Sequence, residues 1–418
     1  MNSTVVVSQL GARMHYAVPR IFASQGRLAQ FYTDICATEG WPSVVNRLPR
    51  QMLPSSLRRL TGRVPKGVPP ELTSTFPNFG VWSAVRRLRE KDVIEHMENS
   101  VWAASGFSRR VASKGFHSAE GLYAFAGEAL EQMQAAKRQG MWTAVEQMNA
   151  PRVVFEELVG GEQMSFPDWA GPYTENRYAQ AYGRREEAEW ALADIIVCPS
   201  DFVRNHVIAR GGSAEKCVVV PYGIDPQFPP QDVIRIGGPL RILTVGEVGL
   251  RKGAQYIAEA ARILGKSATF RIAGPSKLSN EVMARLAQSV ELRGVVPRTE
   301  MVKEYEWADV FLLPSVCEGS ATAVYEALGA GLPVICTENA GSVVRHGIEG
   351  FIVPIRDSQA IASAITELSE HPGTRAAMSE NAVARAAEFT VKRYGERLLD
   401  ALSTLPLQRQ AVNQVANS

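Results

Sequence analysis

The sequence from Leu312 to Ala340, LLPSVCEGSATAVYEALGAGLPVICTENA, predicts a buried strand, a short loop, a helix and a second strand. The first strand is the apolar run at 310–313. The helix is expected over about 321–330, because Gly331 and the proline two residues later end it. The next apolar run, 333–336, is the second strand. Such a βαβ unit places the start of its helix at the C-terminal edge of a parallel sheet, where these sheets bind ligands.

Small residues occupy the start of this predicted helix: Gly319, Ser320, Ala321 and Thr322. The first N–H groups of a helix have no partner within it, and its dipole is positive at this end. Small side chains let an anion come close to these groups. We therefore expect the four residues to bind the phosphates of a ligand.

Two glutamates frame the same site, Glu318 in the loop before the helix and Glu326 more than a turn inside it. A carboxylate that accepts both hydroxyls of a ribose makes two charge-assisted hydrogen bonds, each worth about 1.5–3 kcal/mol. Glu326 is placed for that role. Without further motifs, the two glutamates could equally be non-functional, Glu318 as a loop residue and Glu326 as a solvated helix position. The surrounding motifs decide between these interpretations.

The pattern Glu318-x7-Glu326, followed by Gly-x-Pro and a strand, resembles the signature of the GT4-like family of retaining glycosyltransferases, which have the GT-B fold. Further motifs agree with it: Val245-Gly246 ahead of Arg251-Lys252-Gly253, Ile272-Ala273-Gly274-Pro275, and Asn339-Ala340-Gly341-Ser342. The resemblance covers the C-terminal half densely and the N-terminal half loosely. It implies that Glu326 holds the ribose of a nucleotide and that Glu318 contacts the donor sugar.

The resemblance implies an α/β protein of the GT-B class, with two Rossmann-like, doubly wound parallel-sheet domains facing each other across a cleft. We expect an N-terminal, acceptor-side domain at 1–222, a Pro-rich linker at 223–235 and a C-terminal domain for the nucleotide sugar at 236–390. At 391–418 we expect a helix that crosses back to the N-terminal domain, followed by a frayed tail after Leu407. The strand–helix–strand pattern over 121–146 independently indicates a parallel sheet in the N-terminal half.

The composition excludes several classes of protein. The chain has 418 residues, enough for two or three domains, and its formal net charge of +2 gives no field that points to nucleic acid. Its five cysteines form no CxxC pair and no histidine cluster accompanies them, which favours a reducing compartment and argues against a zinc site. The sequence shows neither a membrane-spanning apolar run nor a signal peptide, so we expect a cytoplasmic protein.

Arg251 and Lys252 lie at the mouth of a second predicted helix. Cations at a helix N-terminus oppose the dipole unless an anion lies between them, so both are candidates for neutralising a diphosphate. Many members of the family carry an arginine directly after the first glycine of this motif, where this chain has Glu247; we assign that charge to Arg251. We expect no divalent metal and no other cofactor, since no DxD-type motif stands at a suitable place.

The remaining site candidates rest on the resemblance. Gly11 and His15 lie in the loop after the first strand, which in relatives touches the donor diphosphate or the acceptor; an ordinary turn and a solvated histidine explain them equally well. Val296 lies where relatives bind the base, although a plain apolar turn would look the same. Where many relatives place a histidine facing the donor sugar, this chain has Gln147 and Asn149. Their amides can hydrogen-bond a sugar or acceptor but cannot transfer protons as imidazole does.

Residues from about 41 to 91 combine many basic side chains with few acids and interleaved apolar residues. The basic residues are Arg47, Arg50, Arg58, Arg59, Arg63, Lys66, Arg86, Arg87, Arg89 and Lys91. One interpretation is a basic, amphipathic surface that docks on an anionic membrane from the cytoplasmic side. The other is a solvated helical insertion.

We therefore predict a retaining glycosyltransferase that moves a hexose-type sugar from a UDP or GDP sugar to a hydroxyl of a glycan or lipid-linked acceptor. Surface or exopolysaccharide assembly is the commonest context among relatives. Two alternatives stay open. An epimerase acting on nucleotide sugars would need acid and base residues converging on the sugar, and the N-terminal half offers no clear set. A non-catalytic subunit that binds nucleotide sugars is favoured by Glu247 and by the absent histidine.

Overall fold

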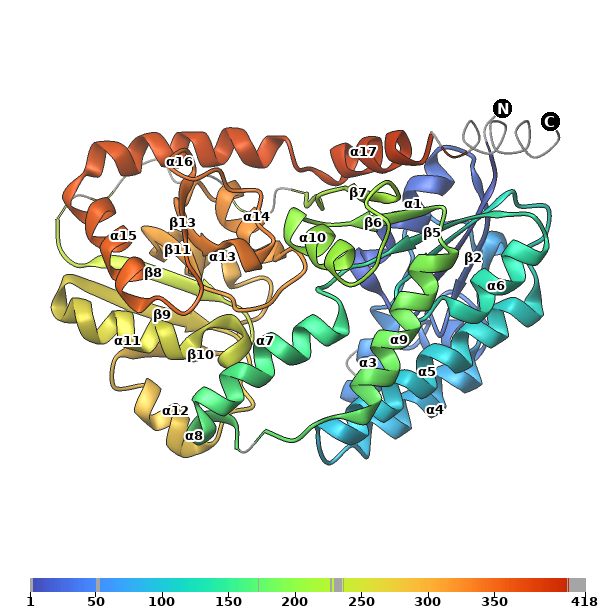
Figure 1. The fold of residues 1–418 in the computed structure, drawn as a ribbon, viewed down its shortest axis with the longest axis horizontal. Coiled ribbons are helices and arrows are strands. Elements are labelled where there is room, and N and C mark those ends of the chain that lie inside the picture. The colour runs from blue at the N-terminus through green and yellow to red at the C-terminus, as the bar shows by residue number, and fades with distance from the viewer. Residues whose placement is uncertain are drawn as a thin grey trace.

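The computed structural model describes residues 3–49, 53–171, 173–225, 228, 235, 237–403 and 405; of residues 55, 56 and 59 it describes the backbone alone. Two α/β domains lie side by side (Figure 1), each built on its own parallel sheet. Most of the predicted linker and the tail after Leu407 lie outside the described residues.

The N-terminal domain contains a seven-stranded sheet in the order β3-β2-β1-β4-β5-β6-β7, in which all neighbours pair in parallel. Its strands are β1 (Val5–Gln9), β2 (Leu28–Thr33), β3 (Thr73–Thr75), β4 (Gly121–Phe125), β5 (Trp142–Glu146), β6 (Ile195–Cys198) and β7 (Cys217–Val219). The central strands are buried along their length, as expected when helices cover both faces of a sheet.

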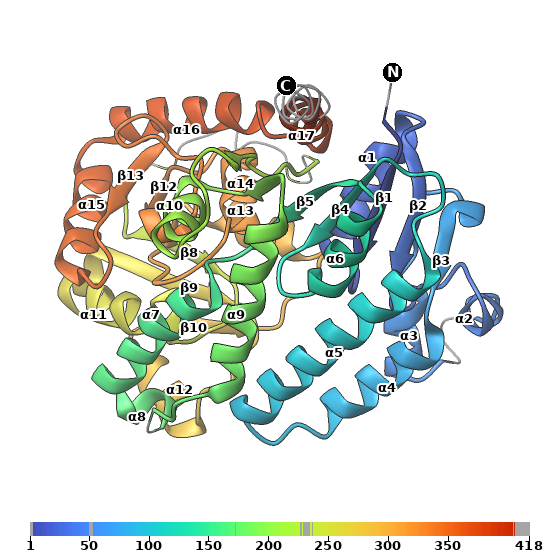
Figure 2. The ribbon, with the colours of Figure 1, turned by 45° about the vertical axis from the view of Figure 1, so that its right-hand side comes forward.

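Most helices of this domain cover the two faces of the sheet, whereas α7 and α8 reach over to the C-terminal domain (Figure 2). The helices are α1 (Ala17–Ser24), α2 (Trp41–Val45), α3 (Ser55–Thr61), α4 (Pro77–Leu88), α5 (Val93–Lys114), α6 (Leu130–Arg138), α7 (Arg152–Ser165), α8 (Pro167–Ala170), α9 (Arg177–Leu192) and α10 (Asp201–Ala209), with short 3₁₀ turns η1 (Arg13–Tyr16) and η3 (Pro70–Leu72). The range 41–91 is not a simple insertion, which corrects the sequence-based boundaries. It contains β3, the edge strand of the sheet, and α4, which packs on α5.

The C-terminal domain contains a six-stranded parallel sheet in the order β10-β9-β8-β11-β12-β13. Its strands are β8 (Leu240–Val245), β9 (Ala268–Ala273), β10 (Val290–Gly294), β11 (Val310–Leu313), β12 (Val334–Thr337) and β13 (Gly350–Val353). Its helices are α11 (Ala254–Leu264), α12 (Asn280–Leu286), α13 (Met301–Trp307), α14 (Thr322–Gly329), α15 (Ser358–Glu370) and α16 (Pro372–Ala387), with 3₁₀ turns η4 (Leu250–Lys252), η5 (Gly265–Ser267) and η6 (Glu338–Ala340). In both sheets the strand order reverses beside the first strand, so each domain is doubly wound.

The last described helix, α17 (Val391–Ser403), lies against the N-terminal domain (Figure 1). Gly395 packs against Ile21 of α1, and the Tyr394 hydroxyl lies 3.5 Å from the carboxylate of Glu146. One buried apolar cluster consequently runs through both domains and α17. The predicted fold class is confirmed: two Rossmann-like parallel-sheet domains face each other.

Candidate functional site

The loop between β11 and α14 is fixed by hydrogen bonds to the η6 turn. The N–H of Glu318 donates to Asn339 O at 3.0 Å, and the N–H of Ala321 donates to Ala340 O at 3.2 Å. Because the Ala321 N–H already has a partner, it is not available to a phosphate in this conformation. The Ser320 hydroxyl is hydrogen-bonded to the Tyr325 hydroxyl at 2.8 Å, whereas Thr322 is exposed at the first position of the helix.

Gly319 is the point where this loop touches the N-terminal domain. A Cβ on this residue would lie 1.8 Å from Met148 O and 2.9 Å from Asn149 Cα, in the segment after β5. The Ser200 hydroxyl of the N-terminal domain donates to Gly319 O at 2.7 Å. A glycine is therefore required here because two backbones from different domains meet without room for a side chain.

Arg251 and Lys252 converge on the carboxylate of Glu318. Glu318 Oε1 lies 2.7 Å from Lys252 Nζ and 2.5 Å from Arg251 NH1. Lys252 reaches it by crossing the end of β8, where a Cβ at Gly246 would lie 2.5 Å from Lys252 Cε. Burial raises the pKa of Glu318, but the two cations outweigh that effect and hold the pKa below its ordinary value. At neutral pH one anion therefore lies between two cations.

Glu326 is buried on α14 rather than solvated, so the alternative of a solvated helix position is wrong. Its Oε2 accepts a hydrogen bond from the Tyr305 hydroxyl at 2.8 Å, and its Oε1 lies 2.7 Å from Arg298 NH2. The first partner comes from α13 and the second from the segment after β10. Val296, two residues before Arg298, is half-buried against the same apolar cluster.

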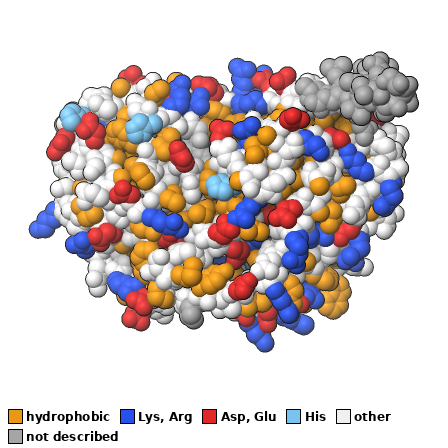
Figure 3. All heavy atoms as spheres, in the orientation of Figure 1, with side chains coloured by type: hydrophobic (Ala, Val, Ile, Leu, Met, Phe, Trp, Pro, Cys, Tyr) orange, Lys and Arg blue, Asp and Glu red, His pale blue; other side chains and the backbone are white. Residues whose placement is uncertain are grey.

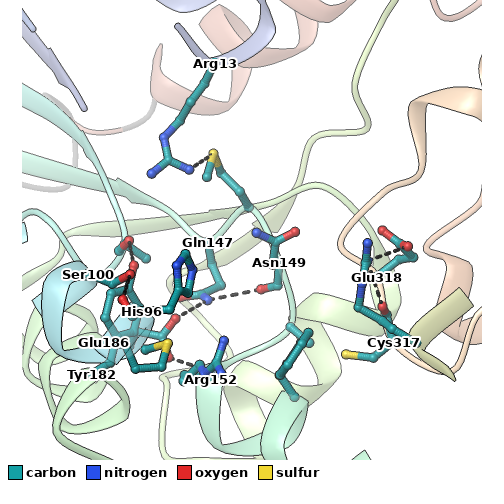
Figure 4. A pocket seen from close by; sticks show the side chains of 16 residues that line it. Arg13, His96, Ser100, Gln147, Asn149, Arg152, Tyr182, Glu186, Cys317 and Glu318 are labelled. Carbon is teal, nitrogen blue, oxygen red and sulfur yellow. Dashed lines mark hydrogen bonds and ion pairs between the residues drawn. The ribbon is translucent and has the colours of Figure 1, made fainter. Parts of the chain in front are cut away.

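A cavity of about 360 Å³ lies between the domains (Figure 4). Of the predicted site residues, Gln147, Asn149, Arg251 and Glu318 line it. A second cavity of about 190 Å³ lies between the loop after β1 and the α4–α5 pair, and Gly11 lines that one. His15 is exposed and lines neither of these cavities, so the structure does not bring it to the site.

The side chain of Gln147 holds the cavity wall together and does not point a free amide at a ligand. Its Nε2 donates to Glu186 Oε1 at 2.8 Å and to Asn149 O at 3.1 Å, while its Oε1 accepts from Trp190 Nε1 at 3.0 Å. Burial raises the pKa of Glu186 to about 7. The sugar contact of Gln147 would require these hydrogen bonds to rearrange, whereas Asn149 is exposed; both contacts stay predictions.

Arg13 and His96 line the interdomain cavity although the sequence did not single them out. Arg13 belongs to the loop that carries Gly11 and His15. It forms an ion pair with Glu128 at 2.9 Å, and the three residues that follow it all have positive φ. Such left-handed conformations cost about 1–2 kcal/mol per non-glycine residue and cluster at functional sites. The sequence could have indicated Arg13, because it lies in the same predicted ligand loop as Gly11 and His15. Nothing near His96 in the sequence indicates a site, because it lies on α5, a separate helix.

Comparison with known proteins identifies the C-terminal half. The model of the family "Glycosyl transferases group 1" matches residues 239–371. The C-terminal domain belongs to this family. The matched range of this glycosyl transferase domain runs from β8 to the end of α15, so it includes Arg251, Lys252, Glu318 and Glu326. The resemblance to glycosyltransferases is thereby confirmed.

Relatives and solved structures agree with this assignment. The chain is similar to the amylovoran biosynthesis glycosyltransferase AmsK of Erwinia amylovora, with 32% identity over 43% of this chain and 49% of AmsK. It is also similar to the putative colanic acid biosynthesis glycosyltransferase WcaL of Salmonella typhimurium, with 28% identity over 51% of this chain and 57% of WcaL. The alignments therefore span about half the length of these curated relatives.

Among solved structures, Anabaena Alr3699/HepE in complex with UDP aligns over 96% of this chain and 100% of its own, with a TM-score of 0.59 and 16% identity. At that identity the likeness shows the fold, which is GT-B. Among the described residues, no group of three or more His, Cys, Asp or Glu side chains is placed to hold a metal ion, and no helix has the length and apolar character to span a bilayer.

Proposed function

We propose that this protein is a retaining glycosyltransferase that moves a hexose-type sugar from a UDP or GDP sugar to a hydroxyl of a glycan or lipid-linked acceptor. The observation that carries the proposal is the convergence of Arg251 and Lys252 beside the start of α14, at the edge of the interdomain cavity. The AmsK and WcaL names support a role in exopolysaccharide assembly, and HepE, which was solved with UDP, supports a nucleotide donor.

The chemical problem is the charge of the leaving group. When the bond between the sugar and the β-phosphate breaks, negative charge grows on that phosphate and the anomeric carbon becomes oxocarbenium-like. Arg251 and Lys252 would stabilise this charge, a role that a divalent metal plays in other enzymes. The carboxylate of Glu318 pairs with both cations and compensates one of their two positive charges. A bound diphosphate would take its place, and Glu318 would turn to the hydroxyls of the donor sugar.

Glu326 is assigned to the ribose of the nucleotide, and Val296 to the base through its backbone. For the carboxylate of Glu326 to accept both ribose hydroxyls, Arg298, whose side chain is 52% exposed and lies over the Phe228 ring, must give up its contact with Oε1. Among the described residues that line the interdomain cavity, we assign none as the nucleophile of a covalent intermediate. Retention then follows from substitution on the face of the departing phosphate, and cleft closure would exclude water.

The acceptor side is assigned to the N-terminal domain, with an anionic membrane surface as partner. Helix α4 exposes the apolar side chains Val81, Trp82 and Leu88, of which Trp82 is 62% and Leu88 83% exposed. Exposed basic residues, among them Arg87, Arg89 and Lys91, lie at the end of the same helix and directly after it. In Figure 3 hydrophobic and basic side chains lie together in the region of α4. Positive charge around an exposed apolar helix face complements an anionic lipid surface.

Incubation with radiolabelled UDP and GDP sugars tests the proposal after a thermal-shift screen has found the nucleotide that binds. A ligand at 100 times its dissociation constant stabilises the protein by about 2.7 kcal/mol. Release of the nucleoside diphosphate with transfer of label to a second molecule or to water supports a transferase. Interconversion of the sugar without release indicates an epimerase. Binding with neither outcome indicates a non-catalytic subunit.

A further inference from the structure

Helix α7 belongs to the N-terminal half of the chain, yet it extends onto the C-terminal domain (Figure 1). Leu158, Phe166 and Trp169, from the α7–α8 segment, pack against the apolar cluster of the C-terminal domain. The Phe166 ring meets the Tyr256 ring of α11 edge-on, with 5.8 Å between the ring centroids. This segment therefore carries side chains of one domain into the body of the other.

Glu162 of α7 places a carboxylate at this contact, and its side chain is 1% exposed. Three donors of the C-terminal domain reach this carboxylate. Gln255 Nε2 and the Tyr256 hydroxyl each donate to Oε2 at 2.7 Å, and Arg356 Nε donates to Oε1 at 2.6 Å. A buried carboxylate without such partners would be strongly destabilising, so the hydrogen bonds fix the positions of Glu162 and Gln255 relative to each other.

The same amide group of Gln255 reaches the turn that carries the two cations of the site. Its Nε2 also donates to Leu250 O at 3.2 Å, and Arg251 and Lys252 follow Leu250 directly in η4. Carboxylate and carbonyl oxygens accept hydrogen bonds only, so both contacts need the NH₂ end of the amide. Two hydrogen bonds in series thus join Glu162 of one domain to the η4 turn of the other.

We propose that Glu162 is a positioning residue for the donor diphosphate site. Acting through Gln255, its carboxylate holds the η4 turn in the conformation that directs Arg251 and Lys252 to the phosphates. The inference rests on the proposed function, which assigns these two cations to the diphosphate. The cations lie in the C-terminal domain, but their placement depends on α7 of the N-terminal domain being docked there.

Two neighbouring donors to one oxygen separate this role from a purely structural one. Gln255→Met and Tyr256→Phe each remove one hydrogen bond to Glu162 Oε2, and both side chains are buried. Of these two described side chains, Gln255 is the one that is also hydrogen-bonded to Leu250 O of η4. Both substitutions should lower the stability of the fold, so the difference between them in phosphate binding reports the contact with the turn.

The measurement is the gain in affinity that the β-phosphate provides, obtained by calorimetric titration with UMP against UDP and with GMP against GDP. In the wild type, the diphosphate of the preferred base should bind more tightly than its monophosphate. Gln255→Met should reduce this gain about 3–10-fold, the factor that corresponds to one net hydrogen bond, and Tyr256→Phe should keep it.

Variants of Glu162 test whether it acts through Gln255. Glu162→Ala should reduce the gain by the same factor as Gln255→Met, and the double variant should reduce it no further, because the two residues act in series. Glu162→Gln keeps an oxygen that can accept from the Gln255 amide, so it should retain the gain. If Glu162→Ala does not fold, the comparison of Gln255→Met with Tyr256→Phe decides.

An equal gain in Gln255→Met and Tyr256→Phe would overturn the inference, as would a full gain in Glu162→Ala or a further loss in the double variant. These results leave the proposed function intact, because they concern how the cations are held. A wild type that binds neither diphosphate more tightly than its monophosphate would instead contradict the assignment of Arg251 and Lys252, and with it the proposed function, before any variant is compared.

Discussion

The ammonium group of Lys252 lies 2.7 Å from the same oxygen of Glu318 that Arg251 contacts at 2.5 Å. One internal carboxylate thus occupies the position between two cations that we assign to the donor diphosphate. Such an arrangement keeps the cations in place before the ligand arrives, because leaving them unpaired in a partly buried site would be costly. It also means that nucleotide binding exchanges one anion for another.

Removal of Lys252 should therefore weaken nucleotide binding more than it weakens the fold. A charge-assisted hydrogen bond is worth about 1.5–3 kcal/mol, so we expect Lys252→Ala to bind UDP or GDP about 10–150 times more weakly. Titration calorimetry measures this directly. Arg262→Ala is the matched control, since Arg262 is an exposed cation of α11 paired with Glu259. An equal loss of affinity in both variants would contradict the assignment.

The stability of the ligand-free protein should depend on the ionisation of Glu318. The pKa of Glu318 in the folded protein is below the ordinary value of about 4.3. The stability that its ion pairs contribute is therefore fully present above about pH 4.3. This stability is lost as the pH falls through the pKa of the folded protein. We expect Glu318→Gln to lower the free energy of unfolding by about 2 kcal/mol at pH 7 and to match the wild type at the acid end. Urea unfolding from pH 7 to pH 3 gives both curves. A constant difference across that range would show that the lost stability is not electrostatic.

The sequence predicted most of the sheets and helices of the C-terminal domain. β11 spans the predicted residues, and α14 begins and ends within a residue of the predicted helix, because apolar runs and the Gly-x-Pro stop are local signals. The N-terminal domain was harder. β3 is three residues long and polar, so nothing in its composition distinguishes it from a loop.

The candidate site was predicted where its residues lie close in the sequence. Glu318 and the small residues after it are consecutive, and the motif named them together. Arg298 and His96 could not be found in this way, since each reaches the site only through the packing of a separate element. For Gln147 the sequence predicted the position but not the role of the side chain. Its amide is hydrogen-bonded to Glu186 and Trp190, which lie about forty residues further along the chain.

The role of Glu326 can be tested separately from phosphate binding, by removing the two ribose hydroxyls from the ligand. If its carboxylate holds the ribose diol, the wild type should bind UDP or GDP, whichever the screen selects, more tightly than the 2′,3′-dideoxy form by about 10-fold or more, because each charge-assisted hydrogen bond is worth about 1.5–3 kcal/mol. Glu326→Ala should bind the two forms equally. Tyr305→Phe removes the hydroxyl that donates to Glu326 but leaves the carboxylate, so it should keep the preference. A preference that persists in Glu326→Ala would place the diol elsewhere.

Gly319 should tolerate no side chain, because its backbone is in direct contact with the backbone of the N-terminal domain. A methyl group at this position would lie 1.8 Å from Met148 O. We expect Gly319→Ala to push the domains apart, to increase the radius of gyration in small-angle scattering and to lower donor turnover about 100-fold, a typical cost of misplacing reacting groups by an ångström.

Gly329 is the control for this substitution. It is the last residue of α14, the helix that follows the Gly319 loop, and a Cβ there would meet nothing within 4 Å. Gly329→Ala should keep full turnover and should raise stability by about 0.4–1 kcal/mol, since alanine reduces the freedom of the unfolded chain. Normal scattering and turnover in Gly319→Ala would mean that the domains do not meet at this loop in solution.

The exposed face of α4 should bind anionic vesicles through both its apolar and its basic side chains. Burying a large apolar side chain contributes about 1.5–3 kcal/mol, so Trp82→Ser and Leu88→Ser should each weaken binding to vesicles of phosphatidylglycerol and phosphatidylcholine about 10-fold or more. Arg89→Gln with Lys91→Gln should weaken binding to these vesicles only at low salt, because screening already removes that attraction at high salt. Met164→Ser is the control, since Met164 is 65% exposed on α7, outside the α4 face. Co-sedimentation measures all of them, and equal binding of the wild type to vesicles of phosphatidylcholine alone would contradict an anionic partner.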